Sequence, residues 1–587
     1  MRYLFLLITF SSLVFNGCIS DPKSTTESAW SRTNNEVICR IDGEPETINT
    51  MLTSSRYTVQ ICEQIFFYLM YFDPYELKLV PQLAKAAPEV TTITDETSPY
   101  QGGKMYTFEI HETAVWDDGK PVTGKDFVFT LKALFHPMVQ AQRYRPYLSF
   151  VRDVEVDPDN PKKISVITEN PPSQAIERIG NAVPLLPAHH YDPESTLEDI
   201  PLSTFFDTEA ITAMVEGDEQ LQKFAERFAS PEFTRQPENI MGAGPYRVEQ
   251  LATGQPTILV KKENWWGDAL ADQYSSLRAY PERLIYKTIV DEASVIAALK
   301  SEEIDAVSDL PPNDFLTLKA SPALQEIYNF HAPPLLAVYL IYINTRDPKL
   351  SDKRVRRALA LSTNIPEIIQ SLYSGMAQQA VTSVHPMDKY FNDTLAPIPY
   401  DPEQARELLA KAGWTDTNQN GIVDKEIDGN TVELSLDLHI TADNDRSRNL
   451  GIIFQDNARQ SGIEINLVAK AFNELIQSQK SGDFQLSFGG RALAPTDWEP
   501  KQNYYSIGDN RTGFGTEESD QLIDELQNTL DPAKRADLYN RIQEIIYDEQ
   551  PEIYLVVTQG RIVTHKRFEV EPSIIHPGFF PQYFKLK

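Results

Sequence analysis

The stretch WDDGKPVTGKDFVFTL places Gly119, Gly124 and Lys125 at the spacing of a phosphate-binding loop. That chemistry needs a Ser or Thr hydroxyl after the lysine to ligate magnesium, together with free backbone N–H groups that hold the phosphate oxygens. Here the position after the lysine is Asp126, an anion, and Pro121 removes one of the N–H donors. The stretch therefore does not predict a nucleotide site.

The same residues predict the start of a helix. Thr123 is an N-cap residue, and Asp126 stands at the third helical position, where a carboxylate meets the positive end of the helix dipole. Val122 can pack on Phe127 as a hydrophobic staple. We expect an amphipathic helix over residues 124–135.

A second candidate for chemistry is the loop DTNQNGIVD. Asp416, Asn418, Asn420 and Asp424 reproduce the spacing of oxygen ligands in a calcium loop. Ile427 stands where a carboxylate normally completes the coordination shell, and an Asx-rich hairpin turn explains the same residues. Calcium binding and a simple turn both remain open at this point.

Histidine and nucleophile patterns do not indicate an enzyme. The sequence has no G-x-S-x-G and no H-E-x-x-H motif. His189 and His190 are adjacent, so their side chains point in different directions and make a poor pair of metal ligands. Apart from the loop at Asp416, we expect no metal site, and we expect no cofactor.

Two carboxylates, Asp497 and Glu499, lie in the loop GGRALAPTDWEP beside Arg491 and Trp498. Paired acids can perform acid–base catalysis, but they can also anchor a ligand or belong to a solvated loop. All three interpretations stay open.

The composition indicates a globular protein of several domains. The chain has 587 residues, which suggests two to four domains, and 41% of its residues are hydrophobic. Its formal charge of −30 argues against nucleic acid as a partner, because binding to the phosphate backbone depends on Lys and Arg.

The N-terminus predicts export. Residues 1–17 have one basic residue followed by a short apolar run, as in a signal peptide. The end of this run, FNGC, resembles a bacterial lipobox, in which Cys18 is lipidated; an ordinary signal with a chance cysteine is the alternative. Residues 18–34 are polar and would form a flexible tether. We therefore expect a periplasmic or cell-surface lipoprotein held by a membrane anchor.

Two cysteines remain, Cys39 and Cys62. An oxidising compartment permits a disulfide between them, but both also fit as small buried hydrophobic residues. The sequence does not decide between these alternatives.

Strand and helix patterns alternate along the chain after residue 34. Examples are RLIYKTIVDEASVIAALKSEEIDAV, which reads strand, helix, strand, and the acidic, helix-rich region 192–235. We find no internal repeat. The expected class is α/β, or mixed α+β.

Taken in order, several segments resemble the family 5 extracellular solute-binding proteins, the peptide receptors of bacterial ABC importers. The family motif W-x-D-G-x-P-x-T-A-x-D is matched from Trp116 to Asp126, with Gly124 in place of alanine. Further matches are PQLAKA, GAGPYRV, NWWGD, SEEIDAV, DKRVRRALAL and YDPEQARELLAKAGW. Together they cover nearly all of the chain from residue 35 to about residue 582.

The resemblance implies a two-lobed periplasmic-binding-protein type II fold with an extra small domain. Lobe I would comprise residues 35–62, 186–335 and 556–587, and the small domain residues 63–185. Lobe II would comprise residues 336–555. The chain would then cross between the lobes twice, an arrangement suited to hinge closure.

The resemblance also implies ligand-binding residues. Arg56 and Tyr57 fall where family members line the pocket, and an arginine there can pair with a ligand carboxylate. Tyr339 and Tyr554 lie near the implied hinges, where their rings can pack on a solute or inside a core. In peptide-binding members an aspartate holds the ligand's amino terminus. The corresponding loop here contains Arg491, Asp497 and Glu499 in a changed spacing.

The implied function is that of a non-catalytic, monomeric receptor that captures a peptide-like solute between two lobes and delivers it to ABC transporter permease subunits. Family members bind peptides, metal chelates, heme and sugars. Two alternatives stand beside this one: a secreted hydrolase acting through Asp497 and Glu499, and a sensory or chaperone-like surface lipoprotein without an importer.

Overall fold

The computed structural model describes residues 32–587, apart from residues 54, 173, 443, 494–497, 508, 509 and 530. The expected signal peptide, most of the tether and Cys18 lie outside the described residues. Residues 35–587 form one compact unit, separate from residues 1–34, and the fold below is that of the larger unit.

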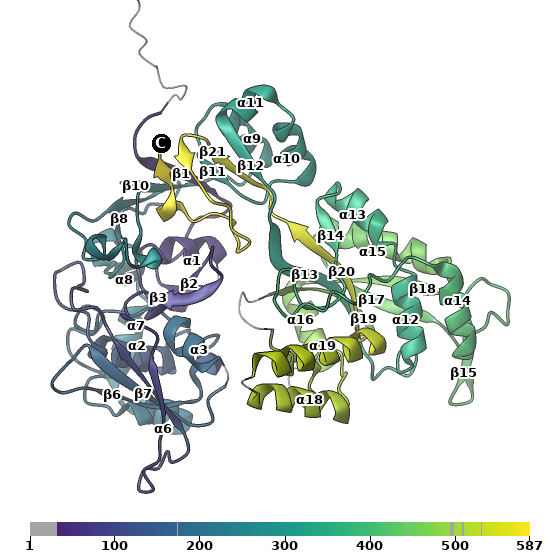
Figure 1. Ribbon diagram of the computed structural model, residues 1–587, viewed down its shortest axis with the longest axis horizontal. Helices are drawn as coiled ribbons and strands as arrows, with labels where there is room; N and C mark the ends of the chain where they lie inside the picture. Colours follow the sequence, from purple (N-terminus) through teal and green to yellow (C-terminus); the bar gives the residue numbers. More distant parts are fainter. Residues whose placement is uncertain are drawn as a thin grey trace, which may run out of the picture. The chain divides into compact units, whose positions relative to one another are not determined.

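A seven-stranded sheet gathers strands from distant parts of the sequence (Figure 1). In spatial order the strands are β12 (Tyr328–His331), β21 (Ile562–His565), β11 (Ala306–Val307), β1 (Glu36–Ile41), β10 (Arg283–Thr288), β9 (Thr257–Lys261) and β8 (Tyr246–Gln250). β1 runs parallel to β10 and β11. In β1, buried residues alternate with half-buried ones, as the period of a strand requires.

A six-stranded sheet is built from the later part of the chain. Its order is β14 (Ala377–Gln379), β20 (Glu552–Gln559), β13 (Pro334–Ile343), β19 (Leu486–Ala492), β17 (Ser435–Thr441) and β18 (Glu464–Lys470). β17 is parallel to β18 and β19, whereas β13 is antiparallel to β19 and β20. Parallel and antiparallel pairs thus occur in one sheet, which gives the mixed α/β fold expected from the sequence.

Two short connections join the two sheets. β12 passes into β13 through residues 332–333, and β20 passes into β21 through residues 560–561. The backbone N–H of Gly560 donates to the carbonyl of Pro333 at 2.7 Å, so the two connections lie side by side. We call residues 332–333 and 560–561 the crossover. The boundaries expected from the sequence, 335/336 and 555/556, fall inside β13 and β20.

Helices cover the six-stranded sheet on both faces. One apolar core joins it to α12 (Lys353–Leu361), α13 (Ile365–Tyr373), α14 (Pro402–Lys411) and α15 (Asp445–Arg459). A second core, on the other face, joins it to α17 (Lys501–Tyr504), α18 (Glu517–Asn528) and α19 (Pro532–Glu549). α16 (Phe472–Ser481) lies between β18 and β19 in sequence.

The seven-stranded sheet shares its largest core with the segment expected as a small domain. That segment contains a four-stranded sheet of β4 (Glu89–Thr92), β5 (Lys104–Glu109), β7 (Lys163–Thr168) and β6 (Val151–Val156), with the hairpin β2 (Met70–Asp73) and β3 (Lys78–Pro81). The same core includes residues of α1 (Arg56–Cys62) and α2 (Gly124–Phe135). Residues 63–185 therefore pack on the first sheet through continuous apolar contact.

The region 192–235 contains the expected helices: α5 (Leu202–Phe206), α6 (Thr208–Gly217), α7 (Glu219–Phe228) and α8 (Pro231–Arg235). Two further helices, α3 (Ala175–Asn181) and α4 (Ala188–Tyr191), precede it. A separate core packs α9 (Glu292–Lys300), α10 (Pro312–Lys319) and α11 (Pro322–Ile327) beside β11 and β12, as Figure 1 shows. The hairpin of β15 (Asp424–Ile427) and β16 (Asn430–Glu433) and the pair β22 (Phe568–Glu569) and β23 (Lys585–Leu586) complete the strands.

The start of α2 matches the expectation from WDDGKPVTGKDF. The Asp126 carboxylate accepts the backbone N–H of Thr123 at 2.8 Å and its hydroxyl at 3.2 Å. It also accepts the N–H of Ala188 at 2.9 Å. Val122 and Phe127 are both buried in the first core. Since the carboxylate is engaged by the protein itself, this loop is a structural turn.

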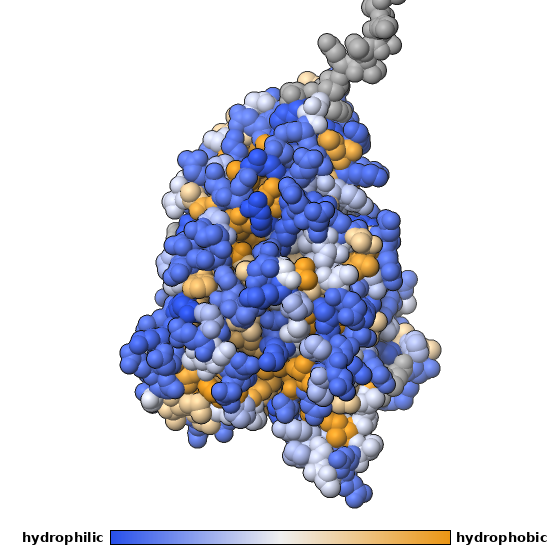
Figure 2. Space-filling model, turned by 90° about the vertical axis from the view of Figure 1, so that its left-hand side faces the viewer, coloured by the Kyte–Doolittle hydropathy of each residue, from blue (hydrophilic) through white to orange (hydrophobic). Residues whose placement is uncertain are grey.

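On the face drawn in Figure 2, hydrophilic residues predominate and hydrophobic residues lie in scattered groups. In the described part of the chain, no helix combines the length and the apolar run that a bilayer span requires.

Candidate functional site

The edges where parallel strands end give the first indication of a site. The carboxyl ends of β1 and β11 share one edge of the seven-stranded sheet, and Asp42 and Asp309 follow them. The carboxyl ends of β17 and β18 share an edge of the other sheet, and Arg446 follows the first of these. Ligands of open α/β sheets bind outside such strand ends. These polar residues are therefore candidates.

Arg56, at the start of α1, joins a cluster on the first of these edges. Its guanidinium pairs with Asp42 at 2.8 Å and with Asp309 at 3.5 Å. His576 Nε2 lies 2.7 Å from the Asp309 carboxylate and 3.4 Å from Arg56. The predicted arginine is thus present, half-exposed, and held by two carboxylates.

The charge of Asp309 is strongly stabilised. Burial alone would raise the pKa of its carboxyl, but the hydrogen bond from His576 and the charges of His576, Arg56 and Arg561 outweigh it, and the pKa falls to about 2. Asp309 also has a backbone φ of 61°, in the left-handed region. Strain of this kind is tolerated where the surrounding contacts fix the residue.

A second group of side chains meets at the crossover. Arg561 is 6% exposed, and its guanidinium donates to the carbonyls of Leu310 and, at 2.9 Å, of Gln559. Burial lowers its pKa, and so does the charge of Arg446, whereas Asp309 and Tyr339 act in the opposite direction. The charge of Tyr339 also acts to raise the pKa of Arg56 and the pKa of Tyr373. Tyr339 lies on β13 of the six-stranded sheet, whereas Asp309 follows β11 of the seven-stranded sheet, and the charges of both act on Arg561.

We call Arg56, Asp309, Tyr339, Arg446 and Arg561 the crossover cluster. Two of its members, Arg56 and Tyr339, are residues predicted from the sequence. Sequence reasoning missed the other three. Asp309 and Arg446 each follow closely after a strand, so the end of a parallel strand is the signal that could have found them.

Tyr57 packs differently from Arg56, its neighbour in α1. It is half-buried against the first core. A Cβ built on Gly43 would come within 2.4 Å of the Tyr57 Oη, so the ring and the Gly43 backbone are in close contact. This places Tyr57 next to the end of β1, near Asp42.

Arg491 and Tyr554, two of the expected ligand-binding residues, belong to a buried network of their own. Arg491 pairs with Glu552 at 2.5 Å and donates to the Tyr504 hydroxyl at 2.9 Å. The Tyr504 hydroxyl donates to Glu552 at 2.7 Å and lies 3.1 Å from the hydroxyl of Tyr554. The charge of Arg491 is therefore neutralised inside the protein.

Strand alternation explains the separation. Leu340 is the register partner of Tyr554 and faces the core of α18 and α19, whereas Tyr339, one residue away, packs on the core of α12 to α15. Because side chains alternate between the faces of a strand, two tyrosines near the crossover end on opposite faces of the sheet.

Of the two predicted carboxylates, the structure describes only Glu499. Asp497 lies outside the described residues. Glu499 accepts the backbone N–H of Lys501 at 3.1 Å, at the beginning of α17. Glu499 thus has a local structural contact.

The other chemical candidates have structural partners. Asp416 accepts the N–H groups of Asn420 and Gly421, and Asp424 accepts the N–H and hydroxyl of Thr417. These are the contacts of an Asx-rich turn. Within the described ranges, no three His, Cys, Asp or Glu side chains are grouped as metal ligands.

The paired histidines and the cysteines also have simple roles. His189 contacts Asp118 at 2.9 Å and His190 contacts the carbonyl of Asn239 at 2.8 Å, in line with their divergent directions. Cys39 and Cys62 are both buried and both free, so the disulfide alternative is wrong. Burial raises the pKa of both thiols.

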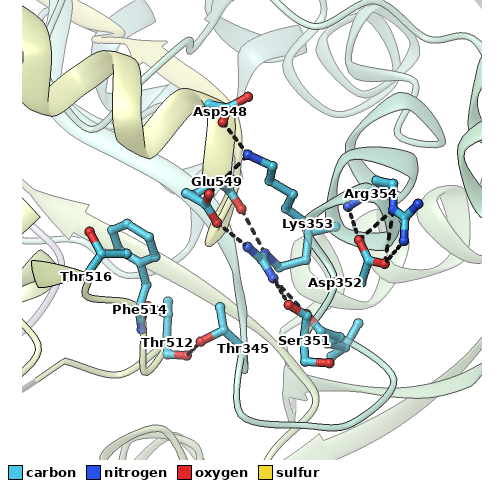
Figure 3. Close-up of polar contacts among 12 residues, drawn as sticks. Thr345, Ser351, Asp352, Lys353, Arg354, Thr512, Phe514, Thr516, Asp548 and Glu549 are labelled. Carbon is cyan, nitrogen blue, oxygen red and sulfur yellow. Dashed lines mark hydrogen bonds and ion pairs between the residues drawn. The ribbon is translucent and has the colours of Figure 1, made fainter. Parts of the chain in front are cut away.

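An open groove of about 830 Å³ lies elsewhere, between the start of α12 and the helices α18 and α19. Its charged side chains pair with one another: Lys353 contacts Asp548 at 2.6 Å and Glu549 at 3.2 Å (Figure 3). The buried Arg356, beside it, contacts Glu549 at 3.0 Å. These contacts join α12 to the end of α19.

Comparison with known proteins supports one family. The sequence model of the bacterial extracellular solute-binding proteins, family 5 Middle, matches residues 78–513. The oligopeptide-binding protein AppA of Bacillus subtilis (strain 168) is 22% identical over 572 residues, which are 95% of this chain and 93% of that protein. The nickel-binding periplasmic protein of Escherichia coli (strain K12) is 26% identical over 54% of this chain and 59% of its own length.

Solved structures agree with this result at the level of the fold. The structure of AppA from Bacillus subtilis in complex with a nonapeptide matches with a TM-score of 0.66 at 19% identity, covering 95% of this chain and 99% of that one. NikA from Brucella suis in complex with Fe(III)-EDTA matches with a TM-score of 0.72 at 17% identity, covering 94% and 100%. The expected fold class is thereby confirmed.

Proposed function

Because the chain belongs to the bacterial extracellular solute-binding proteins of family 5, we propose that it captures a peptide-like solute between two lobes and delivers it to the permease of an ABC importer. Members of this family are binding proteins without catalytic activity, so the hydrolase alternative is excluded. The coarser role, the solute-binding component of an ABC importer, follows from the family.

The crossover is the observation that carries the proposal. Two sheets with separate cores are joined by residues 332–333 and 560–561, which lie side by side. A few linker residues can absorb the rotation of two rigid bodies. In this proposal lobe I consists of residues 35–62, 186–335 and 556–587, the small domain of residues 63–185, and lobe II of residues 336–555.

The mechanism follows from this division. A solute that contacts both lobes stabilises a closed arrangement more than an open one, and its differential affinity sets how far the equilibrium shifts. The permease would then recognise the closed arrangement. The crossover cluster supplies the contacts at the point where both sheets contribute side chains.

A peptide-like solute is the class we favour. The relative named as an oligopeptide-binding protein aligns with 95% of this chain, whereas the one named for nickel aligns with 54%. A site that binds the backbone of a peptide through hydrogen bonds, some of them bridged by water, would accept varied side chains.

The test is a binding measurement with recovery of the probe. The chain is titrated by calorimetry with a pool of synthetic peptides of three to nine residues, and the pool is then analysed by mass spectrometry. Saturable binding with the peptides recovered intact supports the proposal. Absence of binding to every peptide would overturn the peptide assignment.

Membrane attachment through Cys18 is a separate proposal. It is supported by the lipobox-like FNGC at the end of the expected signal peptide. In cells fed an alkyne-labelled fatty acid, the full chain should carry the label and sediment with membranes, whereas a Cys18→Ser variant should not. Equal labelling of the two chains would contradict lipidation at this residue.

A further inference from the structure

A small cavity lies between the end of α1, the strands β1 and β10, and the C-terminal loop 577–581. Its volume is about 10 Å³, close to the space that one water molecule requires. The polar side chains that line it include those of Arg40, Gln60, Glu63, Gln64 and Tyr286. None of these residues belongs to the crossover cluster, so the cavity is separate from the groups to which solute binding is assigned.

Glu63 is the C-cap residue of α1, and its carboxylate has no cation beside it. Among the described residues, none donates a hydrogen bond to this carboxylate or forms an ion pair with it. The residue is half-buried, and the protein displaces enough water from its carboxyl to raise the pKa to about 7. Charged groups removed from water are paired or coordinate metal ions. Glu63 therefore favours a proton or a cation as its partner.

Tyr286 gives an independent indication that the cavity holds a polar occupant. The residue is 2% exposed, and in the described part of the chain its Oη has no hydrogen-bond partner. The charge of Glu63 acts to raise the pKa of this phenol, so the two groups lie near each other. Buried hydroxyl groups without a partner are rare and destabilising. An occupant of the cavity would give Tyr286 a partner.

Two amide groups add further oxygen atoms. Gln60 and Gln64 both line the cavity. The side-chain N–H of Gln64 donates to the backbone carbonyl of Gln60 at 3.2 Å. No described residue donates a hydrogen bond to the amide oxygen of either side chain. Oxygen atoms of carboxylate, amide and hydroxyl groups are the ligands that hard cations prefer.

The charges around the cavity are compatible with one added positive charge. Arg40 is engaged elsewhere, since its Nε donates to the carbonyl of Ile289 at 2.9 Å and its guanidinium lies 3.9 Å from Glu292. Burial raises the pKa of the Cys39 thiol, which is therefore neutral. Among the described residues that line the cavity, Glu63 is the one acid, and a single negative charge matches a monovalent ion. The other groups on which its charge acts are also neutral at pH 7: Cys62, Tyr68, Tyr71 and Tyr144.

We propose that this cavity binds one monovalent cation, held by the Glu63 carboxylate and by the oxygen atoms of Tyr286, Gln60 and Gln64. Sodium, potassium and ammonium have the required chemistry: one positive charge, a size near that of water, and a preference for oxygen. The cation competes with a proton for the carboxylate. Its binding holds the end of α1 to β10, and α1 begins with Arg56 of the crossover cluster. The inference does not depend on the proposed function.

Thermal unfolding of the full chain tests the proposal. Circular dichroism follows unfolding in sodium, potassium, ammonium and choline chloride at equal ionic strength, at pH 8 and at pH 5. Choline is too large for the cavity and provides the reference. Glu63→Gln keeps the size of the side chain without its charge, and Tyr286→Phe removes only the hydroxyl. Glu96→Gln is the matched control, because Glu96 is exposed and has no described partner.

At pH 8, at least one small cation should raise the unfolding temperature by about 1 °C or more above that in choline, which is the shift expected for a chain of this length when the ion is in about 10-fold excess over its Kd. The shift should vanish at pH 5, where a proton occupies the carboxyl. It should also vanish in Glu63→Gln, decrease in Tyr286→Phe and persist in Glu96→Gln.

Equal unfolding temperatures in all four salts would overturn the inference. So would a shift that persists at pH 5 or in Glu63→Gln, or one that Tyr286→Phe leaves undiminished. If Glu63→Gln does not fold, the comparison of the two pH values and the Tyr286→Phe variant still decide. None of these outcomes bears on the proposed function, which the peptide titration tests separately.

Discussion

At the scale of single residues, the Arg491–Glu552 pair shows how an apparent ligand-binding arginine can be a structural one. The Glu552 side chain is 1% exposed and that of Arg491 12%. Charges buried to this degree must be paired, because an isolated ion in a low-dielectric interior is strongly disfavoured. The Tyr504 hydroxyl adds a further hydrogen bond to the carboxylate.

Arg491→Met should therefore destabilise the protein strongly. It would leave the Glu552 carboxylate buried without its cation, and such losses cost about 3–5 kcal/mol. Lys501→Met is the control, because its partner Asp524 is 48% exposed and surface pairs contribute at most about 1 kcal/mol. Urea unfolding followed by circular dichroism gives both values. If Arg491→Met lowers the free energy of unfolding no more than the control does, the buried Arg491–Glu552 pair does not stabilise the fold.

The lowered pKa of Asp309 makes its contribution to the stability of the fold sensitive to acid. Its pKa is about 2 in the folded chain against an ordinary value of 3.8, so the folded state favours the charged carboxylate. The contribution is fully present above about pH 4 and is lost as the pH falls through about 2. The difference between the two pKa values corresponds to roughly 2 kcal/mol.

Asp309→Asn checks this directly, since asparagine tolerates the left-handed backbone of this position. The difference in free energy of unfolding between the two chains should be about 2 kcal/mol at pH 6 and should shrink towards pH 2. Asp272→Asn, at an exposed position, is the control. A difference that does not change with pH would show that the carboxylate is not stabilised by its cations.

At the scale of elements, helix caps differ in importance according to their burial. Asp126 in α2 and Asp291 before α9 both accept N–H groups in a first turn. Asp126 is 4% exposed and also accepts the N–H of Ala188, from the start of α4. The carboxylate of Asp126 thus joins two helices, whereas Asp291 serves only its own.

Asp126→Ala should cost about 3 kcal/mol, because buried N–H groups of Thr123 and Ala188 would lose their acceptor. Asp291→Ala should cost about 1 kcal/mol, the usual loss for an exposed cap. Thermal and urea unfolding of the two variants make the comparison. Equal losses would mean that the contact between α2 and α4 contributes little.

Local patterns explain why the elements could be predicted and the site only in part. The cap at Thr123 and Asp126, the strand–helix–strand segment around α9 and the divergent histidines all depend on residues close in sequence. The crossover cluster joins Arg56, Asp309 and Arg561, which are hundreds of positions apart. These residues come together only through the order and register of the strands, and the identity of each residue does not reveal that order. Tyr554 pairs with Leu340 and not with Tyr339, so alternation along β13 puts the two tyrosines on opposite faces of the sheet.

At the scale of the whole molecule, the two sheets pack into separate apolar cores, and the connections between the sheets are only two residues long. A rigid core resists deformation, so movement is confined to the short connections. Gly560 lies in one of them and touches the other through Pro333. The crossover is therefore the place where a substitution should affect binding more than stability.

Gly560→Val tests this expectation. A Cβ at this position would lie 3.2 Å from Ile562 and 3.3 Å from Leu335, so a branched side chain would crowd both connections. We expect at least about 5-fold weaker binding of the peptide pool, since making closure less favourable by roughly 1 kcal/mol lowers the affinity by that factor. The decrease in radius of gyration on adding peptides, measured by small-angle X-ray scattering, should also become smaller. Gly217→Ala is the control, because a Cβ there meets nothing within 4 Å. If Gly560→Val binds and contracts like this control, the rotation does not pass through residues 560–561, and the hinge must be sought in the longer segments within the lobes.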